Sequence, residues 1–150
     1  MKKKPIKIIK LNIKGGLANP SPPIGPILGA AGINIMDFCK KYNKKTLNQI
    51  GKLIPVVIKI NEDKSFKIKL KKPPTSYLLL GYLNLKKGSN ESKKKKIGVI
   101  STKIIKNIAK EKIKDMNCFK LEPAINMVIG TAKTLGIEIK DEENDKKSFI

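Results

Sequence analysis

The sequence predicts an α+β protein, with a small N-terminal α+β domain over residues 1–72 linked to a small all-helical bundle over residues 73–140. Hydrophobic residues in the first part often alternate with polar ones, as in half-buried strands. In the second part they recur at helical spacing. The dipeptide Pro73-Pro74 separates the two patterns, and two successive prolines cannot continue a sheet ladder.

About three strands are expected in the first domain, over residues 9–13, 56–60 and 66–70. In each, isoleucine, leucine, valine or phenylalanine alternates with lysine or another residue that can face solvent. Pro55 precedes the second run, where an edge or first position tolerates proline. Residues 61–64 separate the last two runs and predict a hairpin turn.

Helices are expected between the first two strands. Ile35, Phe38 and Tyr42 fall on one helical face, and Asn34 is a suitable N-cap with Asp37 three residues later. A second, short helix is expected near residues 24–31.

Three helices are expected in the second domain. A short one over residues 77–83 would be capped by Thr75 or Ser76, and a second spans residues 103–114. The third begins at Leu121 and ends before Gly136, as its long apolar stripe indicates. Residues 141–150 form an acidic tail without periodicity, which we expect to be disordered.

The composition favours a polyanionic partner. The chain carries 33 basic residues, all lysine, against 12 acidic ones, for a net charge of +21. Nucleic acid is the leading candidate and an anionic membrane surface the second. The chain is also rich in isoleucine and asparagine, so part of the charge can reflect compositional drift. The position of the lysines is therefore more informative than their number.

The same composition argues against an enzyme. There is no histidine, no serine-centred nucleophile motif and no suitably paired carboxylates. Cys39 and Cys118 lie far apart without neighbouring ligands, so we expect no metal, no disulfide and no cofactor. No apolar run approaches the roughly 20 residues of a membrane span. A cytoplasmic location is expected.

Residues 86–96 form a basic loop with six lysines, one acid and no aliphatic residue. Phosphates would neutralise this charge with release of counterions, although a merely solvated charge run is the alternative. The predicted RNA-binding residues of this loop are Lys86, Lys87, Gly88, Ser89, Lys93, Lys94, Lys95 and Lys96.

The outer face of the last helix is the second candidate surface. Gly130 lies mid-helix, where glycine costs roughly 1 kcal/mol against alanine, so close approach of another backbone is the natural reason for it. That approach can be the shallow minor groove of RNA or another helix, and the residues alone favour neither. The predicted binding residues here are Asn126, Gly130, Thr131, Lys133 and Thr134.

A third segment, residues 15–32, combines four prolines with flanking glycines. It would present a rigid, largely apolar surface that suits docking of a protein or a flat ligand, or it is an elaborate turn. The residues predicted to face a partner are Pro20, Ser21, Pro22, Pro23, Pro26 and Gly29.

Five segments together resemble the bacterial-type L-eleven family of large-subunit ribosomal proteins: residues 19–29, 32–40, 54–58, 72–74 and 130–136. The resemblance covers roughly residues 5–140. It implies a non-enzymatic structural protein of the cytoplasmic ribosome, which binds large-subunit rRNA at the GTPase-associated centre of the stalk base. The basic loop and the Gly130 face would then contact the RNA.

The resemblance also implies partners for the proline segment. That segment would face translational GTPases, other translation factors and thiopeptide antibiotics, near the stalk and stalk-base ribosomal proteins. Lys3 or Lys4, and Lys40, match methylated lysines of the family. One departure is Lys133, where arginine is frequent, because lysine keeps the charge without the bidentate geometry.

Two other functions remain open at this stage. A DNA-binding helical module with a basic accessory domain would lay the Leu121 helix in a major groove, but that face offers no arginine, glutamine or other cluster of base-reading side chains. A cationic membrane-surface protein is third, because the sequence offers no free amphipathic helix.

Overall fold

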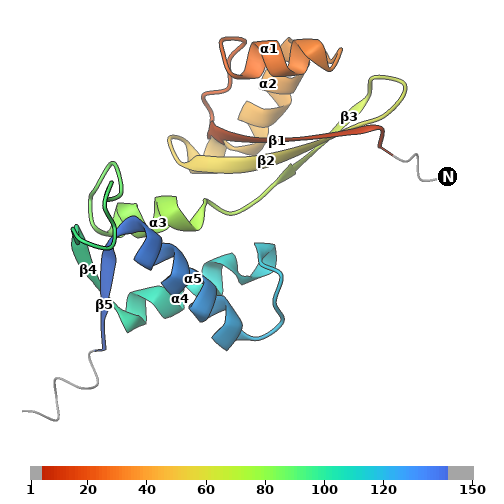
Figure 1. Ribbon diagram of the computed structural model, residues 1–150. Coiled ribbons are helices and arrows are strands. Elements are labelled where there is room, and N and C mark those ends of the chain that lie inside the picture. Colours follow the sequence, from red (N-terminus) through yellow and green to blue (C-terminus); the bar gives the residue numbers. More distant parts are fainter. Residues whose placement is uncertain (1–4, 142–150) are drawn as a thin grey trace, which may run out of the picture. The chain divides into compact units, whose positions relative to one another are not determined.

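The structure is a computed structural model that describes residues 5–141. The chain forms two compact units that divide between Pro73 and Pro74, and each unit is described by itself. Mixed helices and strands confirm the predicted α+β class (Figure 1).

The first unit is a three-stranded antiparallel sheet covered on one face by two helices (Figure 1). The strand order is β1-β2-β3, so β2 pairs with both of the others. A turn at Asn61 joins β2 to β3, where the Asn61 amide donates a 2.9 Å hydrogen bond to the Ser65 carbonyl. The elements are β1 (Lys7–Lys14), α1 (Ile24–Ala30), α2 (Ile35–Lys45), the 3₁₀ turn η1 (Leu47–Gln49), β2 (Leu53–Ile60) and β3 (Phe66–Leu70).

Helix α2 carries the largest side chains of this core. Asn34 caps it as predicted, because its side-chain oxygen accepts hydrogen bonds from the amides of Met36 and Asp37. Phe38 and Tyr42 are fully buried and their rings stack at 5.9 Å between centroids. The Tyr42 hydroxyl donates a 2.8 Å hydrogen bond to the Ile13 carbonyl of β1, which ties the helix to the sheet.

The second unit combines three helices with a two-stranded parallel sheet that lies at one side of them (Figure 1). Its core includes Leu79, Ile105, Ile108 and Val128 from the three helices, which confirms the apolar stripes that predicted α4 and α5. The elements are α3 (Thr75–Tyr82), β4 (Gly98–Ser101), α4 (Thr102–Lys112), the 3₁₀ turn η2 (Ile113–Asp115), α5 (Leu121–Leu135) and β5 (Ile137–Lys140).

The parallel strands β4 and β5 were not predicted, so the second unit is not purely helical. Each strand has only four residues, the shortest run in which alternation indicates a strand; β5 alternates, whereas the sequence Gly-Val-Ile-Ser of β4 does not. Gly136 makes β5 possible, because its φ of +81° ends α5 and turns the chain directly into the extended Ile137. Ile100 and Ile137 then enter the core.

One smaller prediction also needs correction. Helix α3 begins at Thr75 with Pro74 in the cap position, so neither Thr75 nor Ser76 caps it. A proline there fits, because the first turn leaves its amides unpaired in any case. Among residues 5–141, no helix is both long enough and apolar enough to cross a membrane.

Candidate nucleic-acid interface

The basic loop is fixed at both ends to the C-terminal end of α5. The Ser89 amide donates a 2.9 Å hydrogen bond to the Leu135 carbonyl, and the Ile97 amide donates one of the same length to the Gly136 carbonyl. The fit at Gly136 is tight, because a Cβ there would lie 2.7 Å from the Cβ of Ser89 and 3.0 Å from the Lys95 carbonyl oxygen. The loop and the helix therefore form one structural element.

Between these anchors the loop turns back on itself and keeps its charge at the surface. The Glu91 carbonyl accepts hydrogen bonds from the amides of Lys94 and Lys95, at 2.9 and 2.8 Å. The Lys96 ammonium donates a 2.9 Å hydrogen bond to the Ser92 carbonyl. All six loop lysines are exposed, whereas Gly88 and Ser89 are partly covered: Lys86, Lys87, Lys93, Lys94, Lys95 and Lys96.

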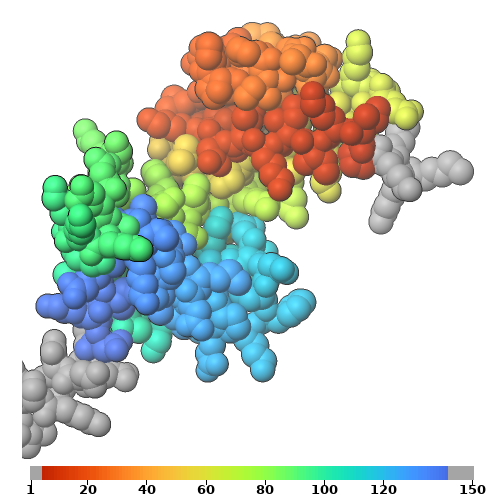
Figure 2. Space-filling view, viewed as in Figure 1, coloured from red at the N-terminus to blue at the C-terminus, as the bar shows by residue number. Residues whose placement is uncertain are grey.

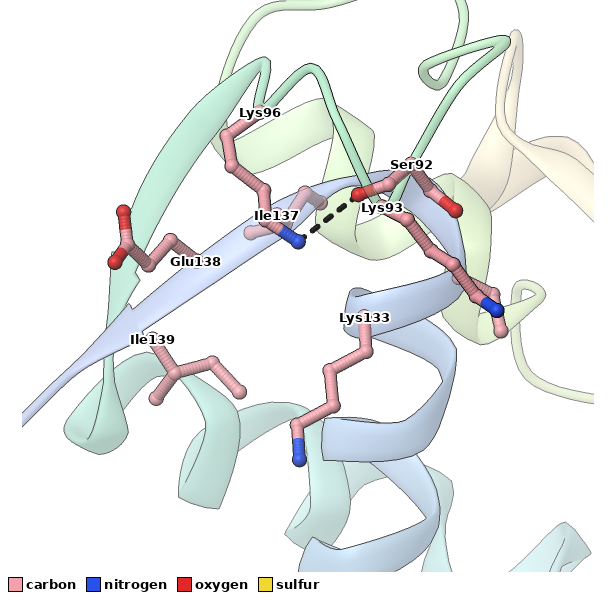
Figure 3. A pocket seen from close by; sticks show the side chains of 8 residues that line it. Ser92, Lys93, Lys96, Lys133, Ile137, Glu138 and Ile139 are labelled. Atoms are coloured by element: carbon pink, nitrogen blue, oxygen red, sulfur yellow. Dashed lines mark hydrogen bonds between the residues drawn. The ribbon is translucent and has the colours of Figure 1, made fainter.

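An open pocket of about 500 Å³ lies between the loop and α5–β5 (Figure 3). Lys93 and Lys96 come to it from the loop, and Lys133 and Thr134 from α5. In the space-filling view the loop and the α5–β5 segment form one continuous surface (Figure 2). The structure thus brings together two sets of predicted residues that are almost 40 positions apart in the chain.

Four residues that line this pocket were not among the predicted site residues. Ile137, Glu138 and Ile139 line it from β5, and Ser92 lines it from the loop. The alternation of Ile137 and Ile139 with Glu138 and Lys140 was the available signal for the strand. The Glu138 carboxylate points away from the Lys133 ammonium, so it does not neutralise that charge (Figure 3).

Gly130 faces open space. Apart from its chain neighbours and the backbone of its own helix, no atom of the described residues lies within 4 Å of the position that a Cβ would occupy. The helix-packing interpretation of this glycine therefore fails within the described residues. Asn126 and Lys133 are exposed on the same helix, so the stripe is accessible to a partner.

The two threonine hydroxyls beside Gly130 donate hydrogen bonds to backbone carbonyls of their own helix. Thr131 donates a 3.1 Å hydrogen bond to the Met127 carbonyl, and Thr134 donates a 2.7 Å bond to the Thr131 carbonyl. Their oxygen lone pairs stay available. These hydroxyls are therefore suited to accept from a donor such as a ribose 2′-hydroxyl.

Hydrogen bonds from the C-terminal end of α2 fix the start of the proline segment. The Asn43 side chain accepts a 2.9 Å hydrogen bond from the Ala18 amide and donates a 3.1 Å bond to the Ala18 carbonyl. The buried Thr46 hydroxyl accepts from the Gly16 amide at 2.8 Å. Gly25 fits only without a side chain, because a Cβ would lie 2.1 Å from the Pro20 carbonyl oxygen. All six predicted partner-facing residues are exposed: Pro20, Ser21, Pro22, Pro23, Pro26 and Gly29.

The remaining candidates are placed as follows. Lys40 is exposed on α2, whereas Lys3, Lys4 and residues 142–150 lie outside the described residues. Cys39 is buried, which raises the pKa of its thiol, and Cys118 is partly exposed. Among the described residues, no group of three or more histidine, cysteine or acidic side chains could hold a metal ion.

Comparison with known proteins covers almost the whole described chain. Residues 9–66 match the family model of the ribosomal protein L11 N-terminal domain, and residues 71–139 match that of the L11 RNA binding domain. The chain is 61% identical to the large ribosomal subunit protein uL11 of Karelsulcia muelleri over 133 residues, which is 89% of this chain and 95% of that protein.

Two further relatives carry the same description. The uL11 protein of Azobacteroides pseudotrichonymphae is 51% identical over 139 residues, which cover 93% of each chain. That of Porphyromonas gingivalis is 50% identical over 134 residues, covering 89% of this chain and 92% of that protein. The chain therefore belongs to the ribosomal protein L11 family, a family of structural, non-enzymatic proteins.

Proposed function

We propose that the second unit binds large-subunit rRNA through the surface made by the basic loop, residues 86–96, and the outer face of α5. The observation that carries the proposal is the anchoring of an exposed six-lysine loop beside an open Gly130 and an exposed Lys133. The matched RNA binding domain, residues 71–139, supports it independently.

The mechanism combines charge, shape and hydroxyl chemistry. The lysines neutralise phosphates and release counterions, which supplies most of the affinity. Gly130 lets a ribose-phosphate backbone approach the helix axis, and the lone pairs of Thr131 and Thr134 accept from 2′-hydroxyls. Without arginine the surface has no guanidinium forks, so recognition depends on the folded shape of the RNA.

The target within the ribosome is the GTPase-associated centre at the stalk base, and the first unit serves as a platform for translation factors. The exposed prolines 20, 22, 23 and 26 support such a platform, because Asn43 of α2 fixes the preceding Ala18 by two hydrogen bonds. Translational GTPases, stalk and stalk-base proteins and thiopeptide antibiotics are its partners. Lys3 or Lys4, and the exposed Lys40, are the candidates for methylation.

A titration tests the RNA target directly. The full chain is titrated with an rRNA fragment of the GTPase-associated centre and with a duplex DNA of the same length, at physiological salt. We expect tight binding of the rRNA fragment only, with an affinity that falls steeply as salt rises. Equal affinity for the DNA would favour the DNA-binding module instead.

A further inference from the structure

One face of the first unit's sheet is lined by lysines. Helices α1 and α2 cover the opposite face of the sheet (Figure 1). Because side chains alternate along a strand, every second strand residue points to the face without these helices. The outward-facing lysines of the three strands are Lys10, Lys14, Lys59, Lys67 and Lys69, and all are exposed. Together we call them the lysine face.

The strand register concentrates this charge. Lys59 lies directly opposite Lys67, and Lys10 and Lys69 flank Val57 in the neighbouring row. Like charges opposite one another disfavour the sheet. Within the described part of the first unit, the three strands themselves carry no acidic residue. The acids of this unit are Asp37 in α2, and Glu62 and Asp63 in the turn between β2 and β3.

Two of the four lysines of α2 on the helical side of the same unit do contact the protein. The Lys41 ammonium lies 4.7 Å from the centroid of the Phe66 ring, and the Lys45 ammonium donates a 3.4 Å hydrogen bond to the Ile68 carbonyl. Within residues 5–141, no side chain of the lysine face has an ion pair or a hydrogen bond.

A shallow pocket of about 250 Å³ lies on the lysine face where β3 ends. The last β2–β3 pair joins Val56 to Leu70, after which the Lys71 amide donates a 2.9 Å hydrogen bond to the Pro55 carbonyl. Lys10, Lys71 and Asn12 line the pocket. Two ammonium groups and an amide donor suit a phosphate group.

We propose that the lysine face binds the phosphodiester backbone of structured RNA without regard to base sequence. It would be a second RNA contact, in addition to the surface of the second unit. No aromatic side chain lies on this face for bases to stack on, which argues against single-stranded RNA. Ile8 is the only large exposed apolar side chain within the three strands of the described unit, and protein interfaces are poor in lysine, which argues against an acidic protein partner.

Lysine acetylation tests the proposal in the full chain. The chain is acetylated with and without an RNA duplex of unrelated sequence, and each site is quantified by mass spectrometry. We expect protection of at least about threefold at Lys10, Lys59 and Lys69, with little change at Lys40 and Lys44 of α2. Equal protection of the α2 lysines, or equal protection by poly-glutamate, would overturn the proposal.

A second test compares the affinities of two charge-matched variants for the RNA duplex. Lys59→Gln/Lys69→Gln should weaken binding of the duplex about three- to tenfold and lower the salt slope by about 1.4–1.8. Lys40→Gln/Lys44→Gln, which removes the same charge from the same unit, should leave both within about twofold. Equal losses in the two variants would contradict a site on the sheet. The sheet variant relieves the Lys59–Lys67 repulsion, so its thermal midpoint should not fall.

The Gly130→Leu variant separates this proposal from the proposed function. Its lysine face should keep its protection by the RNA duplex even when the GTPase-associated-centre fragment no longer binds. Loss of protection at both surfaces in this variant would mean that the sheet is no independent site.

Discussion

The backbone amide of Ser89 donates a 2.9 Å hydrogen bond to the carbonyl of Leu135, and so fixes the start of a six-lysine loop on the end of helix α5. This bond uses one of the carbonyls that every helix C-terminus leaves without an intrahelical partner. The loop lysines and the outer face of α5 are consequently held side by side.

Gly136→Ala should destabilise the second unit by about 2 kcal/mol. The new Cβ would lie 2.7 Å from the Cβ of Ser89, at a φ of +81° that L side chains rarely adopt. Urea unfolding followed by circular dichroism measures the change. Gly51→Ala is the matched control, because its φ is also +81° while no atom beyond its chain neighbours lies within 4 Å of its Cβ position. Equal losses in both variants would show that the contact with Ser89 contributes nothing.

Gly130→Ala should separate stability from binding. Helix propensity should raise the free energy of unfolding by roughly 0.5–1 kcal/mol, because no neighbouring atom opposes the methyl group. Affinity for the rRNA fragment should fall at the same time. Gly81→Ala in α3, which also faces open space, should leave the affinity unchanged. An unchanged affinity in the Gly130 variant would remove the reason for a glycine at this position.

Asn43→Ala should loosen the proline segment. It removes two hydrogen bonds to Ala18 and should cost about 1–2 kcal/mol in the free energy of unfolding. Hydrogen exchange of the Ala18 amide, followed by NMR, should become faster. Asn43→Asp keeps the acceptor and loses the donor, so it should keep most of the protection at Ala18. Asn48→Ala, at an exposed position of η1, is the neutral control.

Tyr42 should make the stability of the first unit depend on alkaline pH. Burial raises the pKa of Tyr42 to about 12, against 10 for the free side chain. Because the folded-state pKa is the higher one, this stabilisation is complete below pH 10 and is lost as the pH rises toward 12. The lysines titrate in the same range, so the difference between wild type and Tyr42→Phe is the quantity to measure. A constant difference from pH 9 to pH 12 would contradict the assigned burial.

The sequence was sufficient wherever a pattern extended over several turns or strand residues. The alternation around Ile9, Ile58 and Ile68 predicted the three-stranded sheet, and the stripe from Leu121 to Leu135 predicted α5. Strand β4 was missed because its four residues do not alternate, and β5 because its alternation covers only four residues at the end of a long helix. Their pairing also joins positions that are 39 residues apart, such as Gly98 and Ile137.

The candidate site shows the same division. Residue types and their order were enough to select the basic loop and Lys133 separately. Their meeting in one pocket depends on the Ser89–Leu135 and Ile97–Gly136 hydrogen bonds, which no local pattern reveals. The open space beside Gly130 likewise depends on where the other helices lie.

The most direct test compares two charge-matched variants of the full chain against the rRNA fragment of the GTPase-associated centre. Lys93→Gln/Lys95→Gln/Lys96→Gln removes charge from the loop, whereas Lys103→Gln/Lys106→Gln/Lys110→Gln removes it from the exposed face of α4. The loop variant should lower the salt slope by about 2–3 and weaken binding by at least about tenfold, while the α4 variant leaves both nearly unchanged. Equal effects of the two variants would contradict a specific binding surface and would show that the lysines act only through the net charge of the chain.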